Sequence, residues 1–130
     1  RDGDRLKVQI ADITFQPNSP RLVTDSTTRQ GARNRAILLR LAEVFDRYST
    51  YRIRIEGHAV NITGTEREER EELRPLSLAR AQEVKDALVE LGMNPRRISV
   101  LGRGGTDPVV PHTDTENRWK NRRVEFILLR

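Results

Sequence analysis

Residues 76–101 read LSLARAQEVKDALVELGMNPRRISVL, a stretch that predicts a helix followed by a strand. Ser77 is a favourable N-cap, because its hydroxyl can accept a hydrogen bond from an otherwise unpaired backbone N–H of the first turn. Gly92 and then Pro95 end the helix. The apolar side chains of the helix share one face at helical spacing, and those of the strand follow: Ala81, Val84, Leu88 and Leu91, then Ile98 and Val100.

The chain before this unit also contains a helix followed by a strand. The helix is predicted from about Gly31 to Tyr48, because its apolar residues recur at helical spacing. These residues are Ile37, Leu38, Leu41, Val44, Phe45 and Tyr48. Ile53 and Ile55 then alternate with charged residues, which predicts a strand that ends at Gly57-His58.

The amino-terminal part begins with a strand and continues as a loop. Leu6, Val8 and Ile10 alternate with polar residues, as expected of a half-buried strand. Ile13 and Phe15 keep the period of two but change parity, so a bulge is predicted near Ala11-Asp12. Pro17 and Pro20 end the strand, and residues 16–30 form a loop rich in Pro, Ser, Thr and Asp.

The last predicted strand lies at the carboxyl end. Gly102, Gly104 and Gly105 predict a flexible turn, and the loop that follows contains two prolines. Val124 to Leu129 is apolar on both faces except for Glu125. A strand that is apolar on both faces is typical of a central or well-covered position in a sheet.

The order of these elements predicts the fold class. Strands that alternate with helices indicate crossover connections and some parallel pairing. Two helices can cover one face of a four-stranded sheet, so we expect an α/β (α+β) two-layer sandwich. Its order is β-α-β-α-β-β, with two main helices on one face of a mixed four-stranded sheet. The length of 130 residues suits a single domain over residues 1–130.

Composition excludes several classes of protein. The chain has no cysteine, so it can form neither a disulfide framework nor a thiolate metal site. No apolar run approaches the roughly 20 residues of a membrane-spanning helix. The net charge of +5 suggests nucleic acid or an anionic membrane as partners to consider. Acidic residues are interleaved with the basic ones and only 5% of residues are aromatic, so nucleic acid is not expected.

Motifs for catalysis or metal binding are missing from the sequence. His58 and His112 fit no metal-binding spacing and are interpreted as polar residues of a strand end and a loop. Ser77 lacks the surroundings of a nucleophile. The glycines of the predicted turn lack the spacing of a phosphate-binding loop. We therefore predict no catalytic residue, no metal and no cofactor.

Two groups of cationic residues suggest an anionic partner. Arg80 falls in the first turn of the predicted helix, where the helix dipole disfavours a cation, and it borders the apolar face. Its partner is either an internal carboxylate or the carboxylate of a ligand, which a guanidinium can bind bidentately. Asn121-Arg122-Arg123-Val124 is either a solvated entry to the last strand or places one arginine in the same pocket. Trp119 is interpreted as a lid on the sheet edge.

Residues 59–75 are the least regular part of the sequence. Glu66–Arg70 and Arg67–Glu71 are opposite-charge pairs at a spacing of four. Thr65 to Leu73 forms either a short exposed helix that ends at Pro75 or a solvated charged turn, and the turn is the favoured interpretation.

Several of these residues together resemble the OmpA-like domain, the peptidoglycan-associating domain of OmpA, peptidoglycan-associated lipoprotein and MotB. The resemblance covers about Ile13 to Leu129. Its most specific part is Leu76-Ser77-Leu78-Ala79-Arg80-Ala81 followed at a distance by Asn121-Arg122-Arg123-Val124. Further matching positions are Ile13-Thr14-Phe15, Ile55-Glu56-Gly57-His58, Val84, Leu88, Gly92, Ile98, Gly102, Gly104 and Pro108.

The resemblance implies a non-catalytic domain that binds the peptide stem of peptidoglycan. It implies a periplasmic location, tethered to or facing the outer membrane of a diderm bacterium, and an origin as the C-terminal domain of a longer envelope protein. In the family an arginine binds the carboxylate of diaminopimelate or a similar diamino acid, and an aspartate binds its ammonium group. The ligand-binding positions implied here are Arg80, Phe15, Asn18, Asn61 and Arg123.

The family aspartate has no counterpart in this chain. The family reads Gly-His-Thr-Asp-x-x-Gly, whereas residues 57–64 read GHAVNITG. Counting from Gly57 places Val60 at the position of the acid, and counting back from Gly64 places Asn61 there. Since a charge-assisted hydrogen bond contributes about 1.5–3 kcal/mol, we expect peptidoglycan binding to be weak or lost.

Two alternatives remain open at this point. Glu66, Glu68 or Glu69 can restore the missing charge by folding over the pocket, and Asn61 can accept a hydrogen bond without carrying charge. The other alternative is a structural or protein-interaction domain that keeps the fold without binding peptidoglycan. Another envelope protein is then the expected partner, near residues 62–74.

Overall fold

The computed structural model describes residues 5–10, 13, 15–16, 21–25 and 27–130. The elements are β1 (Arg5–Ile10), α1 (Arg29–Arg47), β2 (Arg52–Gly57), α2 (Glu66–Glu68), the π-helical turn η1 (Glu69–Leu73), α3 (Arg74–Glu90), the 3-10 turn η2 (Pro95–Arg97), β3 (Ile98–Gly102), the 3-10 turn η3 (Arg118–Asn121) and β4 (Val124–Leu129). The predicted bulge near Ala11-Asp12 lies outside the described residues. No helix in the described ranges combines the length and apolar character needed to cross a bilayer.

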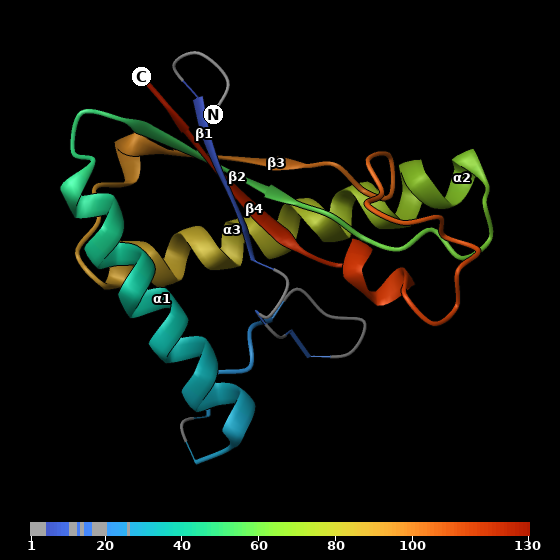
Figure 1. Cartoon of the computed structure of the whole chain (residues 1–130), viewed down its shortest axis with the longest axis horizontal. Coiled ribbons are helices and arrows are strands. Elements are labelled where there is room, and N and C mark those ends of the chain that lie inside the picture. Colours follow the sequence, from blue (N-terminus) through green and yellow to red (C-terminus); the bar gives the residue numbers. More distant parts are fainter. Residues whose placement is uncertain (1–4, 11–12, 14, 17–20, 26) are drawn as a thin grey trace.

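The four strands form one mixed sheet in the order β1-β4-β2-β3 (Figure 1). β4 lies between β1 and β2 and is antiparallel to both, and β2 is parallel to β3. The predicted central position of residues 124–129 is therefore confirmed. The parallel pair requires a crossover connection, and α3 supplies it.

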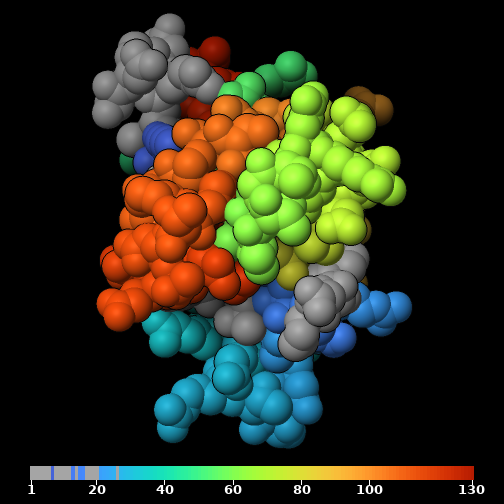
Figure 2. All heavy atoms as spheres, turned by 90° about the vertical axis from the view of Figure 1, so that its right-hand side faces the viewer, coloured from blue at the N-terminus to red at the C-terminus, as the bar shows by residue number. Residues whose placement is uncertain are grey.

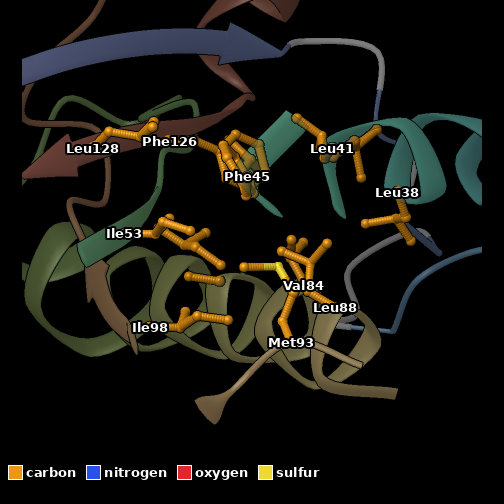
Figure 3. Packing of buried hydrophobic residues seen from close by; sticks show 14 of the residues in the cluster. Leu38, Leu41, Phe45, Ile53, Val84, Leu88, Met93, Ile98, Phe126 and Leu128 are labelled. Carbon is orange, nitrogen blue, oxygen red and sulfur yellow. The ribbon is translucent and has the colours of Figure 1, made fainter. Parts of the chain in front are cut away.

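One apolar core joins the sheet to both long helices (Figure 3). On the sheet side, Ile53 and Ile55 lie opposite Leu128 and Phe126 of β4, so the four side chains share one face. Against this face pack residues from α1 and α3: Leu38, Leu41, Phe45, Ala81, Val84 and Leu88. The two-layer sandwich with two main helices on one face is therefore confirmed.

The helical segment before α3 corrects two predictions. Residues 66–90 are continuously helical through α2, η1 and α3, so the favoured charged turn is wrong and Ser77 is not an N-cap. The helix continues past Pro75 because the turn before it is a wider π-helical turn. In this turn the Arg74 N–H donates a hydrogen bond to the Glu69 carbonyl. Ser77 lies inside the helix, where its hydroxyl donates to the Arg74 carbonyl and accepts from the Gly104 N–H.

The amino end of α1 starts two residues before the predicted boundary. Thr28 is the N-cap, and its hydroxyl accepts a hydrogen bond of 3.0 Å from the Gly31 N–H. Asn34 is fully buried and donates to the Val23 carbonyl at 2.9 Å, which fixes the preceding loop against the helix. Phe15 and Leu22 form an isolated antiparallel bridge within that loop.

Two glycines bring β2 and β3 into backbone contact with α3. A Cβ atom built on Gly57 would lie 2.1 Å from the Ser77 carbonyl oxygen, and one on Gly102 would lie 2.6 Å from the Arg74 carbonyl oxygen. Because any side chain would separate the helix from the sheet, these glycines determine how closely Leu76 and Arg80 approach the end of β2.

Gly57→Ala is therefore expected to lower the free energy of unfolding by about 1–3 kcal/mol, as typical overpacking does. The clash is between two backbones in regular elements, neither of which can move without displacing the core. Urea unfolding followed by circular dichroism measures the change. Arg52→Ala, at the exposed start of the same strand, is the control and should change stability by less than about 0.5 kcal/mol. Equal stability of the two variants would contradict the close contact.

Candidate functional site

A pocket of about 620 Å³ lies at one end of the sheet, where the chain leaves β2. Its walls come from five parts of the chain: residues 13, 15 and 16, residues 59, 60 and 62, the helix over residues 66–90, Trp119 and Arg122. Figure 2 shows the yellow-green helical segment beside the orange segment that precedes β4, at this end of the molecule. The lining residues are Ile13, Phe15, Gln16, Ala59, Val60, Ile62, Glu68, Glu72, Leu73, Leu76, Arg80, Trp119 and Arg122.

Two arginines give one part of the pocket a positive charge. Arg80 is buried, and its guanidinium lies 5.1 Å from the centre of the Phe15 ring, in cation–π geometry. Burial, followed by the positive charge of Arg122, lowers the pKa of Arg80. An arginine stays protonated in proteins despite such a shift. The concentration of positive charge in a partly desolvated site favours an anionic group here.

Two glutamates give another part of the pocket a negative charge. Glu68 accepts hydrogen bonds at Oε1 from the Thr63 backbone N–H at 2.9 Å and from the Thr63 hydroxyl at 2.6 Å. The Thr63 hydroxyl bond is the main reason that the pKa of Glu68 lies below its ordinary value. Glu72 is exposed at the mouth of the pocket, and it forms no hydrogen bond or ion pair within the described ranges.

The helix presents both charges on one face. Glu68, Glu72, Leu76 and Arg80 follow one another at intervals of four residues, and all four line the pocket. Residues four apart lie above one another on a helix surface. The pocket is therefore bipolar, with acidic residues toward the amino end of this helical face, a leucine in the middle and an arginine toward the carboxyl end.

Glu69 and Asn61 hold the pocket together from outside its lining. Both oxygens of Glu69 accept from the Gly105 N–H, at 2.8 and 2.9 Å, and Oε1 also accepts from the Asn61 amide at 3.0 Å. Asn61 Oδ1 in turn accepts from the Gly64 N–H at 2.8 Å. Both side chains are buried, and these bonds join residues 59–64 to the turn after β3 and to the helical segment over residues 66–73, called the inserted helix because the family resemblance implies a shorter connection to Leu76.

The apolar wall of the pocket includes Val60 and Trp119. Val60 is almost completely buried, so an apolar surface stands at the position that counting from Gly57 assigns to the family carboxylate. Trp119 is 52% exposed and lines the pocket. Its interpretation as a lid on the sheet edge is therefore wrong, because the short turn η3 places the indole beside the pocket.

The residues predicted by resemblance separate into two groups. Phe15 and Arg80 line the pocket, whereas Asn61 and Arg123 lie outside its lining, and Asn18 is not among the described residues. Arg122 is the arginine that shares the pocket with Arg80. Strand alternation could have indicated this, because in β4 Val124 faces the core and Glu125 faces the opposite side, which is also the side of Arg123.

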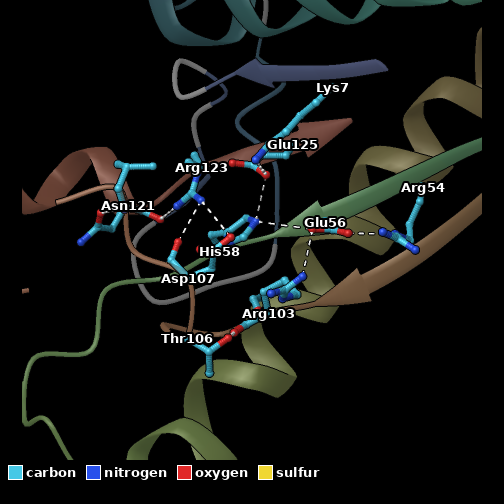
Figure 4. A network of polar contacts seen from close by, with 12 residues as sticks. Lys7, Arg54, Glu56, His58, Arg103, Thr106, Asp107, Asn121, Arg123 and Glu125 are labelled. Atoms are coloured by element: carbon cyan, nitrogen blue, oxygen red, sulfur yellow. Dashed lines mark hydrogen bonds and ion pairs between the residues drawn. The ribbon is translucent and has the colours of Figure 1, made fainter. Parts of the chain in front are cut away.

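Arg123 belongs to a charged network on the face of the sheet that the helices leave uncovered (Figure 4). Two buried glutamates, Glu56 and Glu125, are opposite each other on β2 and β4. Four cationic side chains pair with them at 2.6–3.5 Å: Arg123 and Lys7 with Glu125, and Arg54 and Arg103 with Glu56.

His58 lies between these two glutamates. The possible ligand atoms of the three residues lie within 4.8 Å of one another, close enough to bind a metal ion as far as distance is concerned. Its Nε2 is 3.5 Å from Glu125 and 3.9 Å from Glu56, and neither ring nitrogen has a hydrogen-bond partner in the described part of the chain. Among the described residues, these four cations already outnumber the three carboxylates of Glu56, Glu125 and Asp107, the last of which lies 4.0 Å from Arg123. A divalent cation would increase this excess of positive charge, so the network does not favour a metal site.

His112 and Asn121 hold the loop that precedes β4. The His112 Nδ1 atom accepts from the Asn61 N–H and from the Asn121 amide, which leaves Nε2 to donate to the Gly105 carbonyl at 2.8 Å. Asn121 is fully buried and also accepts from the N–H groups of residues 109 and 110. Both side chains are used in structural bonds.

Residues 14–122 match the protein-family model described as "OmpA family". The chain belongs to the OmpA family. The match extends over both long helices and every residue that lines the pocket except Ile13, and it ends before Arg123 and β4.

Curated proteins with similar sequences are longer than this chain. The peptidoglycan-binding protein ArfA of Mycobacterium tuberculosis is 36% identical over 92 residues, which are 71% of this chain and 27% of ArfA. Motility protein B of Helicobacter pylori is 42% identical over 51 residues, covering 39% of this chain and 20% of that protein. The Escherichia coli protein named "Probable lipoprotein YiaD" is 28% identical over 129 residues, which are 98% of this chain and 53% of that protein. The chain thus spans about half or less of these relatives.

Solved structures of similar fold include a MotB-like protein from Desulfovibrio vulgaris. It has a TM-score of 0.76 and 28% identity, and the match covers 99% of this chain and 78% of that one. The cell wall anchor of the T6SS from Pseudomonas aeruginosa has a TM-score of 0.68 and 25% identity, covering 96% and 80%. The peptidoglycan-associated lipoprotein of Burkholderia pseudomallei has a TM-score of 0.65 and 22% identity, covering 94% and 88%.

Proposed function

We propose that this chain is a non-catalytic domain of the bacterial cell envelope that associates with peptidoglycan through the pocket around Arg80. The observation that carries the proposal is the position of Arg80, which is the arginine of the Leu-Ser-x-x-Arg-Ala motif and is buried in the pocket wall. Relatives named for peptidoglycan or cell-wall binding, ArfA and the T6SS anchor, support it.

In this proposal Arg80 binds a carboxylate of the peptide stem. The planar guanidinium can donate two parallel hydrogen bonds to one carboxylate. The Phe15 ring lies against the guanidinium, and Arg122 adds a second positive charge to the same part of the pocket. Peptidoglycan stem peptides carry such carboxylates together with a free amine, so both charges of the pocket have a partner in one ligand.

Binding is proposed to be weaker than in relatives that carry the family aspartate. Val60 offers an ammonium group no hydrogen bond, and its apolar surface adds a desolvation cost. Losing one charge-assisted hydrogen bond corresponds to roughly 10- to 100-fold in affinity. The domain is placed by this proposal in the periplasm, tethered to or facing the outer membrane of a diderm bacterium.

A second candidate is a protein-interaction domain that does not bind peptidoglycan. Ile62 is 63% exposed and Trp119 is 52% exposed at the edge of the pocket. Two large apolar side chains near the inserted helix favour contact with another envelope protein.

Co-sedimentation of the purified chain with bacterial sacculi distinguishes the two candidates. Peptidoglycan association predicts that the chain pellets with sacculi and is released by a soluble stem peptide that contains diaminopimelate. A chain that stays in the supernatant at all sacculus concentrations would overturn the proposal and leave the protein-interaction candidate. Binding that falls steeply with salt and is not released by the peptide would indicate non-specific attraction.

Val60→Asp is expected to increase the affinity for the stem peptide, by roughly 10- to 100-fold. The substitution supplies a carboxylate on the pocket wall, at the position that counting from Gly57 assigns to the family acid. Isothermal titration with the peptide measures the change. Val60→Asn, which adds a polar group without the charge, is the matched control and should gain less. An unchanged affinity for Val60→Asp would mean that the missing acid does not limit binding.

A further inference from the structure

The inserted helical segment places acidic side chains in the pocket, although the family acid position is apolar. Glu72 and Glu68 both line the pocket, one and two turns of helix away from Leu76, respectively, on the side opposite to Arg80. Glu69 lies between them but faces away, because Gly105 and Asn61 bind its carboxylate. The acids in the pocket are therefore distinct from the acid that holds the segment in place.

The π-helical turn explains why these side chains reach the pocket. Over Glu69–Leu73 the helix bonds from residue i to i+5, so each turn contains more residues than in an α-helix. A spacing of four then stays on one face through the turn, and it aligns Glu68 and Glu72 with Leu76 and Arg80. Such single π-turns occur frequently at functional sites.

The two glutamates differ in what they can offer a ligand. One oxygen of Glu68 is used by the two hydrogen bonds from Thr63, which fix the side chain in place. Glu72 has no hydrogen bond or ion pair to a described residue, and its carboxylate is exposed. Glu72 is therefore the side chain able to move onto a ligand, and Glu68 adds fixed negative charge behind it.

We propose that Glu72, supported by Glu68, binds the ammonium group of the peptidoglycan stem peptide while Arg80 binds its carboxylate. The proposal rests on the proposed function. It assigns the negative end of the binding site to the inserted helix, away from the loop after β2. Since Glu72 is exposed, water screens its charge more than it would a buried acid, and binding remains weaker than in relatives with the aspartate.

Isothermal titration with two probes tests the assignment. One probe is a stem tetrapeptide that contains diaminopimelate, and the other is the same peptide acetylated at the free amine of that residue. The unaltered chain is expected to prefer the free amine by roughly 3- to 10-fold, the range for a screened charge pair. Glu72→Gln should remove this preference and leave the affinity for the acetylated peptide unchanged.

Glu71→Gln is the matched control, because it removes the same charge from the neighbouring position, which does not line the pocket. It should keep the preference for the free amine. The double variant Glu72→Gln/Val60→Asp should regain that preference through the new acid. If the Glu72→Gln variant prefers the free-amine peptide as strongly as the unaltered chain does, the assignment to Glu72 is wrong while the proposed function stands. If neither peptide binds, the proposed function itself fails.

Discussion

Glu125→Ala is expected to lower the free energy of unfolding by about 3–5 kcal/mol, the usual cost of removing one partner of a buried ion pair. The side chain of Glu125 is 1% exposed, and its carboxylate lies 2.6 Å from Arg123 and 2.9 Å from Lys7. Without it the guanidinium of Arg123, which is only 4% exposed, keeps the carbonyls of Asp107 and Asn121 and a longer ion pair of 4.0 Å with the half-exposed Asp107 carboxylate. Urea unfolding measures the change.

Glu43→Ala is the control for this prediction, because it removes a carboxylate from a surface pair. Glu43 lies 3.3 Å from Arg40, and both side chains are more than half exposed. Exposed pairs of this kind contribute about 0–1 kcal/mol. If Glu125→Ala lowers the free energy of unfolding no more than Glu43→Ala does, the charged network on the sheet face opposite the helices does not stabilise the fold.

The sheet order could be predicted because the pattern of β4 is unambiguous. Five of its six residues are apolar, so a covered position between two other strands was the consistent interpretation, and the structure places it there. The exception, Glu125, could be recognised as unusual. Its partners could not be predicted, since Lys7, Arg123 and His58 come from three separate parts of the chain.

The helical insertion was mispredicted because two local signals outweighed a longer pattern. Pro75 normally ends a helix and Ser77 commonly begins one, so together they suggested a break between residues 73 and 77. The spacing of four from Glu68 through Glu72 and Leu76 to Arg80 was present in the sequence. It becomes meaningful only if the helix is continuous, and the π-turn that allows this has no clear sequence signature.

The sequence therefore predicted the cationic half of the candidate site, and the acidic half only in part. Arg80 and Phe15 could be found from the family motif, and the structure brings them together in the pocket. Of the three glutamates named from the sequence as replacements for the missing charge, Glu68 lines the pocket, whereas Glu66 and Glu69 do not. Glu72 was missed because it lies in a segment that the family motif does not contain. The arginine near β4 was assigned to the wrong neighbour, since Arg122 rather than Arg123 lines the pocket.

Arg80→Ala is expected to reduce affinity for the stem peptide by roughly 100-fold, the equivalent of about 3 kcal/mol for a bidentate charge-assisted contact. Arg80→Lys should retain part of the affinity, since an ammonium keeps the charge but cannot form two parallel bonds to a carboxylate. Isothermal titration with the peptide measures both variants. Arg47→Ala, in the last turn of α1, removes the same charge outside the pocket lining and should bind as the unaltered chain does.

A second probe separates a binding role of Arg80 from a purely structural one. Arg80 is buried against Phe15, so its removal also costs packing, and a general loss of affinity alone would be ambiguous. The stem peptide with its diaminopimelate carboxylate converted to an amide lacks the proposed partner of the guanidinium. The unaltered chain should bind the amidated peptide much more weakly than the acid, and Arg80→Ala should bind the two equally. An Arg80→Ala variant that still prefers the free carboxylate would assign this contact to another cation, and Arg122, on the same pocket wall, would be the next residue to substitute.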